Sequence, residues 1–347
     1  MRAGQRAVRN SCLFLAGLLL HGCYYTQAIR GQMEVMNKRE PIAEVIGRDD
    51  TSEFVAARLA LVQDARQFSI DELGLPDNKS YRTYADLGRD FVVWNVFAAP
   101  EFSLQAKKWC YLFVGCVAYR GYFREADAGK KASKLRSAGL DVYVGGVAAY
   151  STLGHFSDPV LNTMMRWDDT QMLAVLFHEL AHQVLFIKGD TGFNESFASA
   201  VEEVGVARFL KARGREEELL SYQNRVALQG RIAGLMAAAR DDLESYYAQP
   251  IDDDTKRLRK ARRFAQLAAS IQSELQQSGR QSSAWSEASL NNARLLSFSL
   301  YDKRLPAFRA LLKDCDGFLD CFYNEARRIA ELDPTQRNAY LDTLANR

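Results

Sequence analysis

The residues whose types and spacing are best suited to catalysis lie in one apolar segment, 171–186. This segment contains His178-Glu179-Leu180-Ala181-His182. Residues four apart lie one above the other on a helix, so both imidazoles can reach one zinc ion. Glu179 lies beside them, and zinc lowers the pKa of a bound water toward neutrality. Glu179 can therefore take the proton of that water and pass it to a leaving amine. The pattern predicts zinc-dependent hydrolysis with Glu179 as the general base.

A catalytic zinc ion needs a third protein ligand and an open fourth position. A third histidine six residues after His182 is excluded, because that position is Lys188. Beyond the histidines of the motif, His155 is the only histidine after residue 22. The third ligand is therefore expected to be a carboxylate.

A second predicted helix, 193–205, follows a turn at 188–192 and carries Asn194, Glu195 and Glu202. A turn of this length lets the helix fold back, so that its first turn lies over the histidines. We predict Glu195 as the third ligand, and Glu202 and Asn194 as acceptors that orient the ligand imidazoles. If Glu195 cannot reach the metal, Glu202 or His155 becomes the alternative ligand.

A hydrogen-bond donor that stabilises the oxyanion of the reaction is also expected near the metal. Tyr150, before the zinc helix, and Tyr301, in the helical C-terminal part, are the candidates. His155 is a third candidate, although its loop could equally be structural.

The helices and strands that must position these groups differ along the chain. Helices and strands alternate before about residue 168, and helices predominate after it. A helix is expected over 52–73, strands over 91–97, 111–114 and 141–144, and a helix over 124–138. From about residue 168 almost everything favours helix, including a long hairpin over 215–278 that turns at Gln249-Pro250. We predict an α+β fold in which a small sheet packs against the zinc helices, about 169–212, before a helical part, about 213–347.

The composition is that of an ordinary folded protein, with 347 residues, 48% of them hydrophobic and 25% charged. A formal charge of +2 gives no electrostatic reason to expect nucleic acid as a partner. There is no internal repeat or low-complexity linker. Residues 51–347 are therefore expected to form a single domain. The sequence does not indicate whether the protein is a monomer or an oligomer.

The N-terminus has the pattern of a secretory signal, because Arg2, Arg6 and Arg9 precede an apolar stretch, 12–20, that is too short to span a membrane. A short buried helix is the alternative, but it would leave these arginines without partners. The sequence Leu20-His21-Gly22-Cys23 resembles a bacterial lipobox, which implies a signal peptide over 1–22, lipidation at Cys23 and an anchor lead over 23–50. Because Tyr24 is not aspartate, this resemblance implies an outer-membrane anchor that faces the periplasm.

Removing residues 1–22 deletes three arginines and no acids, which leaves a net charge of −1. Four cysteines then remain besides Cys23 in an oxidising compartment, and they can pair in three ways: Cys110, Cys116, Cys315 and Cys321. The sequence does not choose between these pairings.

His178-Glu179-Leu180-Ala181-His182-Gln183, followed by Asn194-Glu195-Ser196-Phe197-Ala198-Ser199 and Glu202, resembles the gluzincin metallopeptidases, especially the alanyl-type aminopeptidases. The interval between the two motifs is about six residues shorter here. The whole chain is similar to a bacterial family of zinc aminopeptidase lipoproteins, through Gly22-Cys23-Tyr24-Tyr25, 115–123, 149–154, Asp158-Pro159 and the zinc motif. The resemblance covers most of residues 23–330 and implies a peptide substrate that is cut near its N-terminus.

One departure weakens the exopeptidase assignment. Alanyl-type enzymes bind the substrate amine with a glutamate on a strand before the zinc helix, and the corresponding stretch here, 145–150, has no acid. This stretch could still be an edge strand that pairs with a peptide, or a plain structural turn. A zinc endopeptidase, and a non-catalytic envelope lipoprotein with a structural zinc, therefore remain as alternatives.

Overall fold

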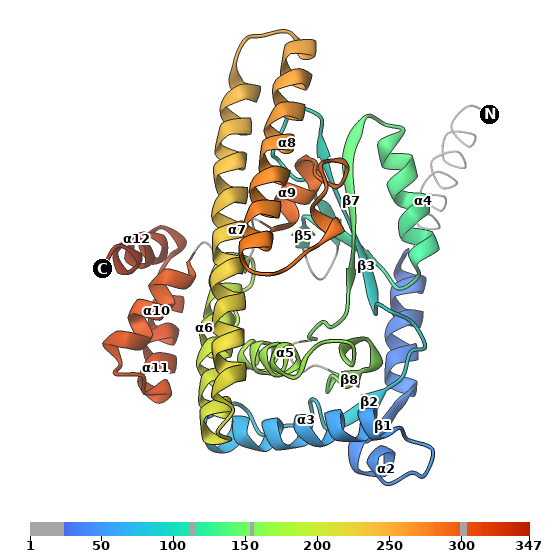
Figure 1. The fold of residues 1–347 in the computed structure, drawn as a ribbon, viewed down its shortest axis with the longest axis vertical. Helices are drawn as coiled ribbons and strands as arrows, with labels where there is room; N and C mark the ends of the chain where they lie inside the picture. Colours follow the sequence, from blue (N-terminus) through green and yellow to red (C-terminus); the bar gives the residue numbers. More distant parts are fainter. Residues whose placement is uncertain (1–23, 112–114, 153–155, 299–303) are drawn as a thin grey trace, which may run out of the picture.

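The computed structural model describes residues 24–111, 115–152, 156–298 and 304–347 and confirms the predicted α+β class, with small sheets and a helical C-terminal half (Figure 1). The central sheet is antiparallel, in the order β6 (Tyr119–Tyr122), β3 (Val93–Pro100) and β7 (Leu140–Val147). Helix α4 (Glu125–Arg136) covers one face of this sheet, where Trp94, Val96 and Val142 pack against its alanines. β7 lies at an edge of this sheet.

The other face of the central sheet carries Asn95, Phe97, Tyr119, Tyr143 and Gly145, because side chains alternate along a strand and these positions are in register. At one end of this face the guanidinium of Arg294, from α9 (Asn292–Phe298), lies 5.2 Å from the centre of the Tyr143 ring. α9 therefore fixes the sheet to the helical half of the molecule.

Residues 24–50, expected as an anchor lead, are part of the folded unit. They form a helix over residues 24–37, then β1 (Arg39–Pro41) and α2 (Ile42–Ile46), and Val35, Ile42 and Val45 lie in the main core. β1 pairs with β2 (Thr83–Ala85), which also pairs with β8 (Val160–Leu161). The lead is stabilised by the same core that supports the rest of the chain.

The helices follow the predicted order closely. α3 spans Glu53–Asp71, and the predicted zinc helices are α5 (Asp169–Ala181) and α6 (Thr191–Ala212). The long hairpin is α7 (Glu216–Ala248) and α8 (Asp253–Gln277), where the Asp252 carboxylate accepts a hydrogen bond from the Thr255 amide. A short 3-10 turn precedes α5, and two more precede α9: Asn162–Met164, Ser283–Trp285 and Glu287–Ser289.

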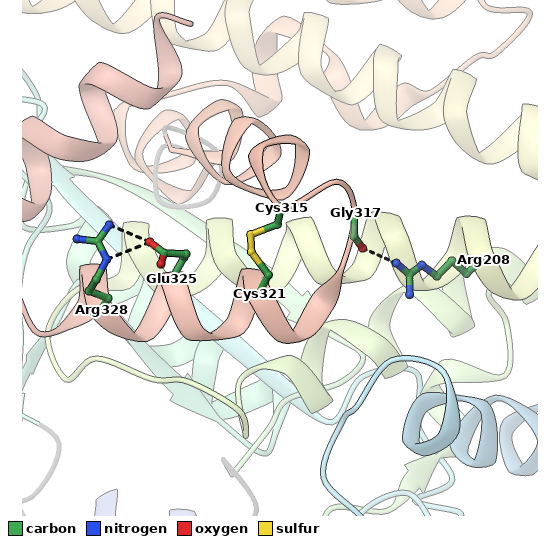
Figure 2. Close-up of a disulfide and its surroundings, with 6 residues drawn as sticks. All are labelled: Arg208, Cys315, Gly317, Cys321, Glu325 and Arg328. Carbon is green, nitrogen blue, oxygen red and sulfur yellow. Dashed lines mark hydrogen bonds and ion pairs between the residues drawn. A yellow bond between two sulfur atoms is a disulfide. The ribbon is translucent and has the colours of Figure 1, made fainter.

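Three C-terminal helices pack on the outer side of α6: α10 (Leu305–Asp314), α11 (Leu319–Ala330) and α12 (Pro334–Ala345) (Figure 1). Cys315 and Cys321 form a disulfide that joins the end of α10 to α11 (Figure 2). The same figure shows Arg208 of α6 donating to the carbonyl of Gly317, at 2.5 Å, which ties the α10–α11 turn to α6. The disulfide holds α10 and α11 together, and the Arg208 bond anchors their turn to the helix that carries Glu195.

The second disulfide joins Cys110 and Cys116, which are directly opposite in the hairpin of β4 (Trp109–Tyr111) and β5 (Gly115–Val117). The structure thus selects one of the three pairings that the sequence left open. Within the described part of the chain, none of the helices has both the length and the apolar character that crossing a bilayer requires. Residues 1–22 and Cys23 lie outside the described residues.

Candidate metal site

Helix α5 begins where the sequence predicts, because the Asp168 carboxylate accepts a hydrogen bond from the Gln171 amide, at 2.7 Å. The helix ends earlier than expected, at Ala181 and not at Phe186. His182 is the residue that follows the last turn, and its backbone still bonds to His178. The two imidazoles therefore keep the one-turn spacing on which the metal prediction depends.

The loop between α5 and α6 is fixed by Asn194, whose side-chain amide bonds to both the N–H and the carbonyl of Ile187, each at 2.8 Å. Asn194 was expected to accept a hydrogen bond from an imidazole, and in the structure its side-chain amide bonds to the backbone of Ile187 instead. Asp190 caps α6 at the Phe193 amide and binds Arg304 and Arg337. Asn194 thus positions Glu195 through the loop.

The two helices approach closely at Gly205 of α6. A Cβ atom at this position would lie 2.8 Å from the ring of Phe177 and 2.9 Å from the side chain of Leu73. Only a glycine lets the backbone of α6 come this near to α5. This approach packs α6 closely against α5.

The predicted ligand groups of His178, His182 and Glu195 converge, with one donor atom from each within 4.8 Å of the others. Nε2 of His178 lies 3.2 Å from one oxygen of Glu195, and Nε2 of His182 lies 3.7 Å from the other. Ligands about 2.1 Å from a tetrahedral zinc ion lie roughly 3.4 Å apart, and the 3.2 and 3.7 Å separations are close to this value. Two imidazoles and a carboxylate are a donor set that zinc accepts in catalytic sites.

Glu202 lies where the sequence places it, behind the first histidine. Its carboxylate is 3.1 Å from Nδ1 of His178, and its other oxygen accepts a hydrogen bond from the Tyr222 hydroxyl at 3.2 Å. A carboxylate on Nδ1 keeps the proton there and leaves Nε2 free for a metal.

The electrostatics of the site suit exchange of a proton for a cation. Burial lowers the pKa of His178, but its contacts with Glu195 and Glu202 outweigh burial and raise that pKa to about 10. Burial and the neighbouring His178 lower the pKa of His182 to about 4, so this imidazole is neutral. Burial alone would raise the pKa of Glu195, but His178 holds it below its ordinary value. A cation at the centre of the three groups would replace the proton on His178.

Glu179 lies between the histidines in sequence, and its surroundings favour a group that exchanges protons. Burial, chiefly, raises its pKa to about 7, with the nearby Glu195 adding to the effect and His178 opposing it. A carboxyl group with a pKa near neutrality can both accept and donate a proton at physiological pH. Among the described residues no side chain or amide donates a hydrogen bond to its carboxylate.

Of the predicted oxyanion donors, Tyr150 lies among the described residues, and it is bonded away from the three ligands. The Tyr150 hydroxyl donates to Oε1 of Gln32, and the ring packs against Phe123. Burial raises the pKa of Tyr150, and Asp158 adds to this effect. Tyr301 and His155 lie outside the described residues.

Two further tyrosines, which were not predicted, have pKa values that carboxylates of the site raise. Burial, then Glu195, raises the pKa of Tyr119 on β6, and burial, then Glu179, raises the pKa of Tyr81. Tyr119 belongs to the segment 115–123 that carries the family resemblance, which was the only sequence signal for it. Tyr81 and Tyr222 had no such signal, because each is far from the motif in sequence.

One protein family accounts for most of the chain. The model of the family described as "Putative aminopeptidase" matches residues 23–341. No curated protein and no solved structure matches the chain. The chain therefore belongs to this family of aminopeptidases, and the family implies peptidase activity.

Proposed function

We propose that this protein is a zinc-dependent aminopeptidase in which His178, His182 and Glu195 bind one zinc ion and Glu179 is the general base. The observation that supports it most is the convergence of the three ligand groups at spacings that fit zinc, next to a carboxyl group with a pKa of about 7. Membership of an aminopeptidase family supports a peptide as the substrate.

Each residue then has a defined part in peptide hydrolysis. The zinc ion would polarise the scissile carbonyl and lower the pKa of a water molecule. Glu179 takes a proton from this water and delivers it to the leaving amine. Glu202 fixes the orientation of His178 through Nδ1. Tyr119 joins Tyr150 and Tyr301 as a candidate donor to the oxyanion, because the charge of Glu195 raises the pKa of Tyr119 in addition to burial.

An extended peptide could bind along β7, which has β3 on one side and no strand on the other among the described residues. Backbone groups at such an edge can pair with a peptide of any sequence. Gly146 on this strand is required by packing, because a Cβ atom there would lie 2.5 Å from the ring of Phe91. The stretch 145–150, at the end of this strand, has no acid for the substrate amine, so cleavage inside peptides is the alternative activity.

The test uses purified residues 24–347 with zinc, the Glu179→Gln variant and a mixed peptide library. We expect about one zinc ion per chain, release of N-terminal residues by the wild type, and no turnover by the variant despite the same zinc content. Acetylating the substrate N-terminus separates the two activities, because an aminopeptidase loses such substrates and an endopeptidase keeps them. Zinc-loaded wild type that cleaves no peptide would point instead to a non-catalytic lipoprotein with structural zinc.

We also propose that Cys23 is lipidated and anchors the protein to the bacterial outer membrane, facing the periplasm. The family match begins at Cys23. A diacylated, amide-capped cysteine carries enough acyl chain for stable anchoring. Incorporation of radiolabelled palmitate into the wild type, and its loss in Cys23→Ser, is the expected result. Equal labelling of both proteins would refute the anchor.

A further inference from the structure

The N-terminal turns of α7 belong to the same core as α5 and α6, the helices of the candidate metal site (Figure 1). Leu219 and Tyr222 lie in this core, whereas the buried residues of α7 from Leu228 onward pack with α8. Tyr222 is 3% exposed. A buried tyrosine needs a hydrogen-bond partner inside the protein, and the partner of Tyr222 lies beside the metal site.

That partner is Glu202, whose two oxygens make two different contacts. The Tyr222 hydroxyl donates to one oxygen, at 3.2 Å. The other oxygen lies 3.1 Å from Nδ1 of His178. A glutamate side chain turns about three bonds, so one contact alone leaves the plane of its carboxylate free to rotate. The two contacts, one on each oxygen, fix that plane against the imidazole.

The contact with Tyr222 also keeps apart two carboxylates that lie on opposite sides of one imidazole. Glu195 lies at Nε2 of His178, and Glu202 lies at Nδ1. Zinc accepts any carboxylate that can reach it. The hydrogen bond from Tyr222 ties Glu202 to α7, on the Nδ1 side of the ring. The Nε2 side is thereby left to Glu195.

Tyr222 is itself fixed by a neighbour on the same face of α7. The guanidinium carbon of Arg225, three residues on, lies 5.4 Å from the centre of the Tyr222 ring. The same guanidinium donates to the Asp168 carboxylate and to the Thr170 hydroxyl, each at 2.7 Å. Asp168 caps the start of α5. α7 therefore binds α5 through Arg225 and α6 through Tyr222, so the tyrosine has a defined place relative to both helices.

We propose that Tyr222 is a positioning residue for the metal site: its hydroxyl holds Glu202 against Nδ1 of His178, so that Nε2 is presented to the metal ion. The inference rests on the proposed function, in which His178 is a zinc ligand. It adds α7 to the helices that build the site. Tyr222 acts through Glu202 and is assigned no contact with the metal or the substrate.

The test compares zinc binding by Tyr222→Phe and Tyr323→Phe, each of which keeps the ring and loses the hydroxyl. Tyr323 lies in the same core, and its hydroxyl donates to the carbonyl of Leu73, at 2.8 Å. We expect the zinc Kd to rise about 3- to 10-fold for Tyr222→Phe, less than for loss of Glu202 itself, and to stay unchanged for Tyr323→Phe. Both variants should lose a similar amount of stability in urea, because each loses one buried hydrogen bond. A weaker fold alone would therefore not explain the difference in zinc binding.

A double-mutant cycle measures whether Tyr222 acts through Glu202. In the Glu202→Ala background, Tyr222→Phe should change the zinc Kd by less than about twofold, because the acceptor of its hydrogen bond is already absent. An equal rise in Kd in both backgrounds overturns the inference. A wild-type Kd in Tyr222→Phe alone overturns it as well.

Crystal structures of the zinc-free proteins give a second measurement that depends on neither metal nor activity. We expect Glu202 to stay 3.1 Å from Nδ1 of His178 in the wild type, and to move beyond about 3.5 Å in Tyr222→Phe. An unmoved Glu202 in the variant overturns the inference and leaves the proposed function intact. A wild type that binds no zinc, with Glu202 displaced only in the variant, overturns the proposed function, and the hold of Tyr222 on Glu202 stands.

Discussion

Replacing Glu202 tests how much the carboxylate behind His178 contributes to metal binding. One oxygen lies 3.1 Å from Nδ1 of His178, and the other accepts from Tyr222 at 3.2 Å. Alanine removes both the acceptor and the charge that favour a free Nε2, and such partners contribute about 10- to 100-fold to metal affinity. We expect zinc binding to weaken about 100-fold for Glu202→Ala, which corresponds to about 2.7 kcal/mol.

Glutamine at the same position should weaken zinc binding less, by about 10-fold or about 1.4 kcal/mol. Its single carbonyl oxygen can still accept from His178, and its amide can donate to the Tyr222 hydroxyl. The assay is a zinc titration against a competing chelator at constant pH. Glu203→Gln is the matched control, because Glu203 lies on the same helix and pairs with Arg309. A wild-type zinc affinity in Glu202→Ala, or an equal loss of zinc affinity in Glu203→Gln, refutes the role of Glu202 in orienting His178.

Two further substitutions and one binding measurement test the packing and the charges of the same region. Gly205→Ala should destabilise the fold by about 1–3 kcal/mol in urea unfolding because its Cβ overlaps Phe177, whereas Gly230→Ala, with open space around it, should be neutral or stabilising. Asp190→Asn should cost about 3 kcal/mol in the same assay, since it leaves the buried Arg337 without its carboxylate. Zinc binding should release about one proton at pH 7, because the pKa of His178 lies near 10 without metal, and affinity should rise with pH below that value. Calorimetry in buffers of different ionisation enthalpy measures this release. An absence of release contradicts the ion pairs of His178 with Glu195 and Glu202.

The fold was predictable where a single segment determines its own structure. The hairpin over 215–278 follows from an apolar stripe, a Pro250 break and an aspartate cap, and the structure confirms it as α7 and α8. Residues 24–50 were less predictable, because their helix, strand and core contacts depend on partners far along the chain, such as β2. The pairing of Cys110 with Cys116 likewise depends on a hairpin register that spacing alone does not fix.

The candidate site shows the same limit. The positions of His178, His182, Glu195 and Glu202 follow from helical spacing and one short turn, so the sequence could place them together. Asn194 differs because its amide satisfies the backbone of Ile187. Tyr222 could not be foreseen, since its hydrogen bond to Glu202 depends on how α7 packs against α6.

The central claim is that His178, His182 and Glu195 bind one zinc ion. The most direct test is a crystal structure of the zinc-loaded protein with anomalous diffraction at the zinc edge. We predict one zinc peak with two imidazole nitrogens at about 2.0–2.1 Å and a Glu195 oxygen at about 2.0–2.2 Å. A zinc peak elsewhere, or a zinc ion on the two histidines with Glu195 out of reach, contradicts the claim.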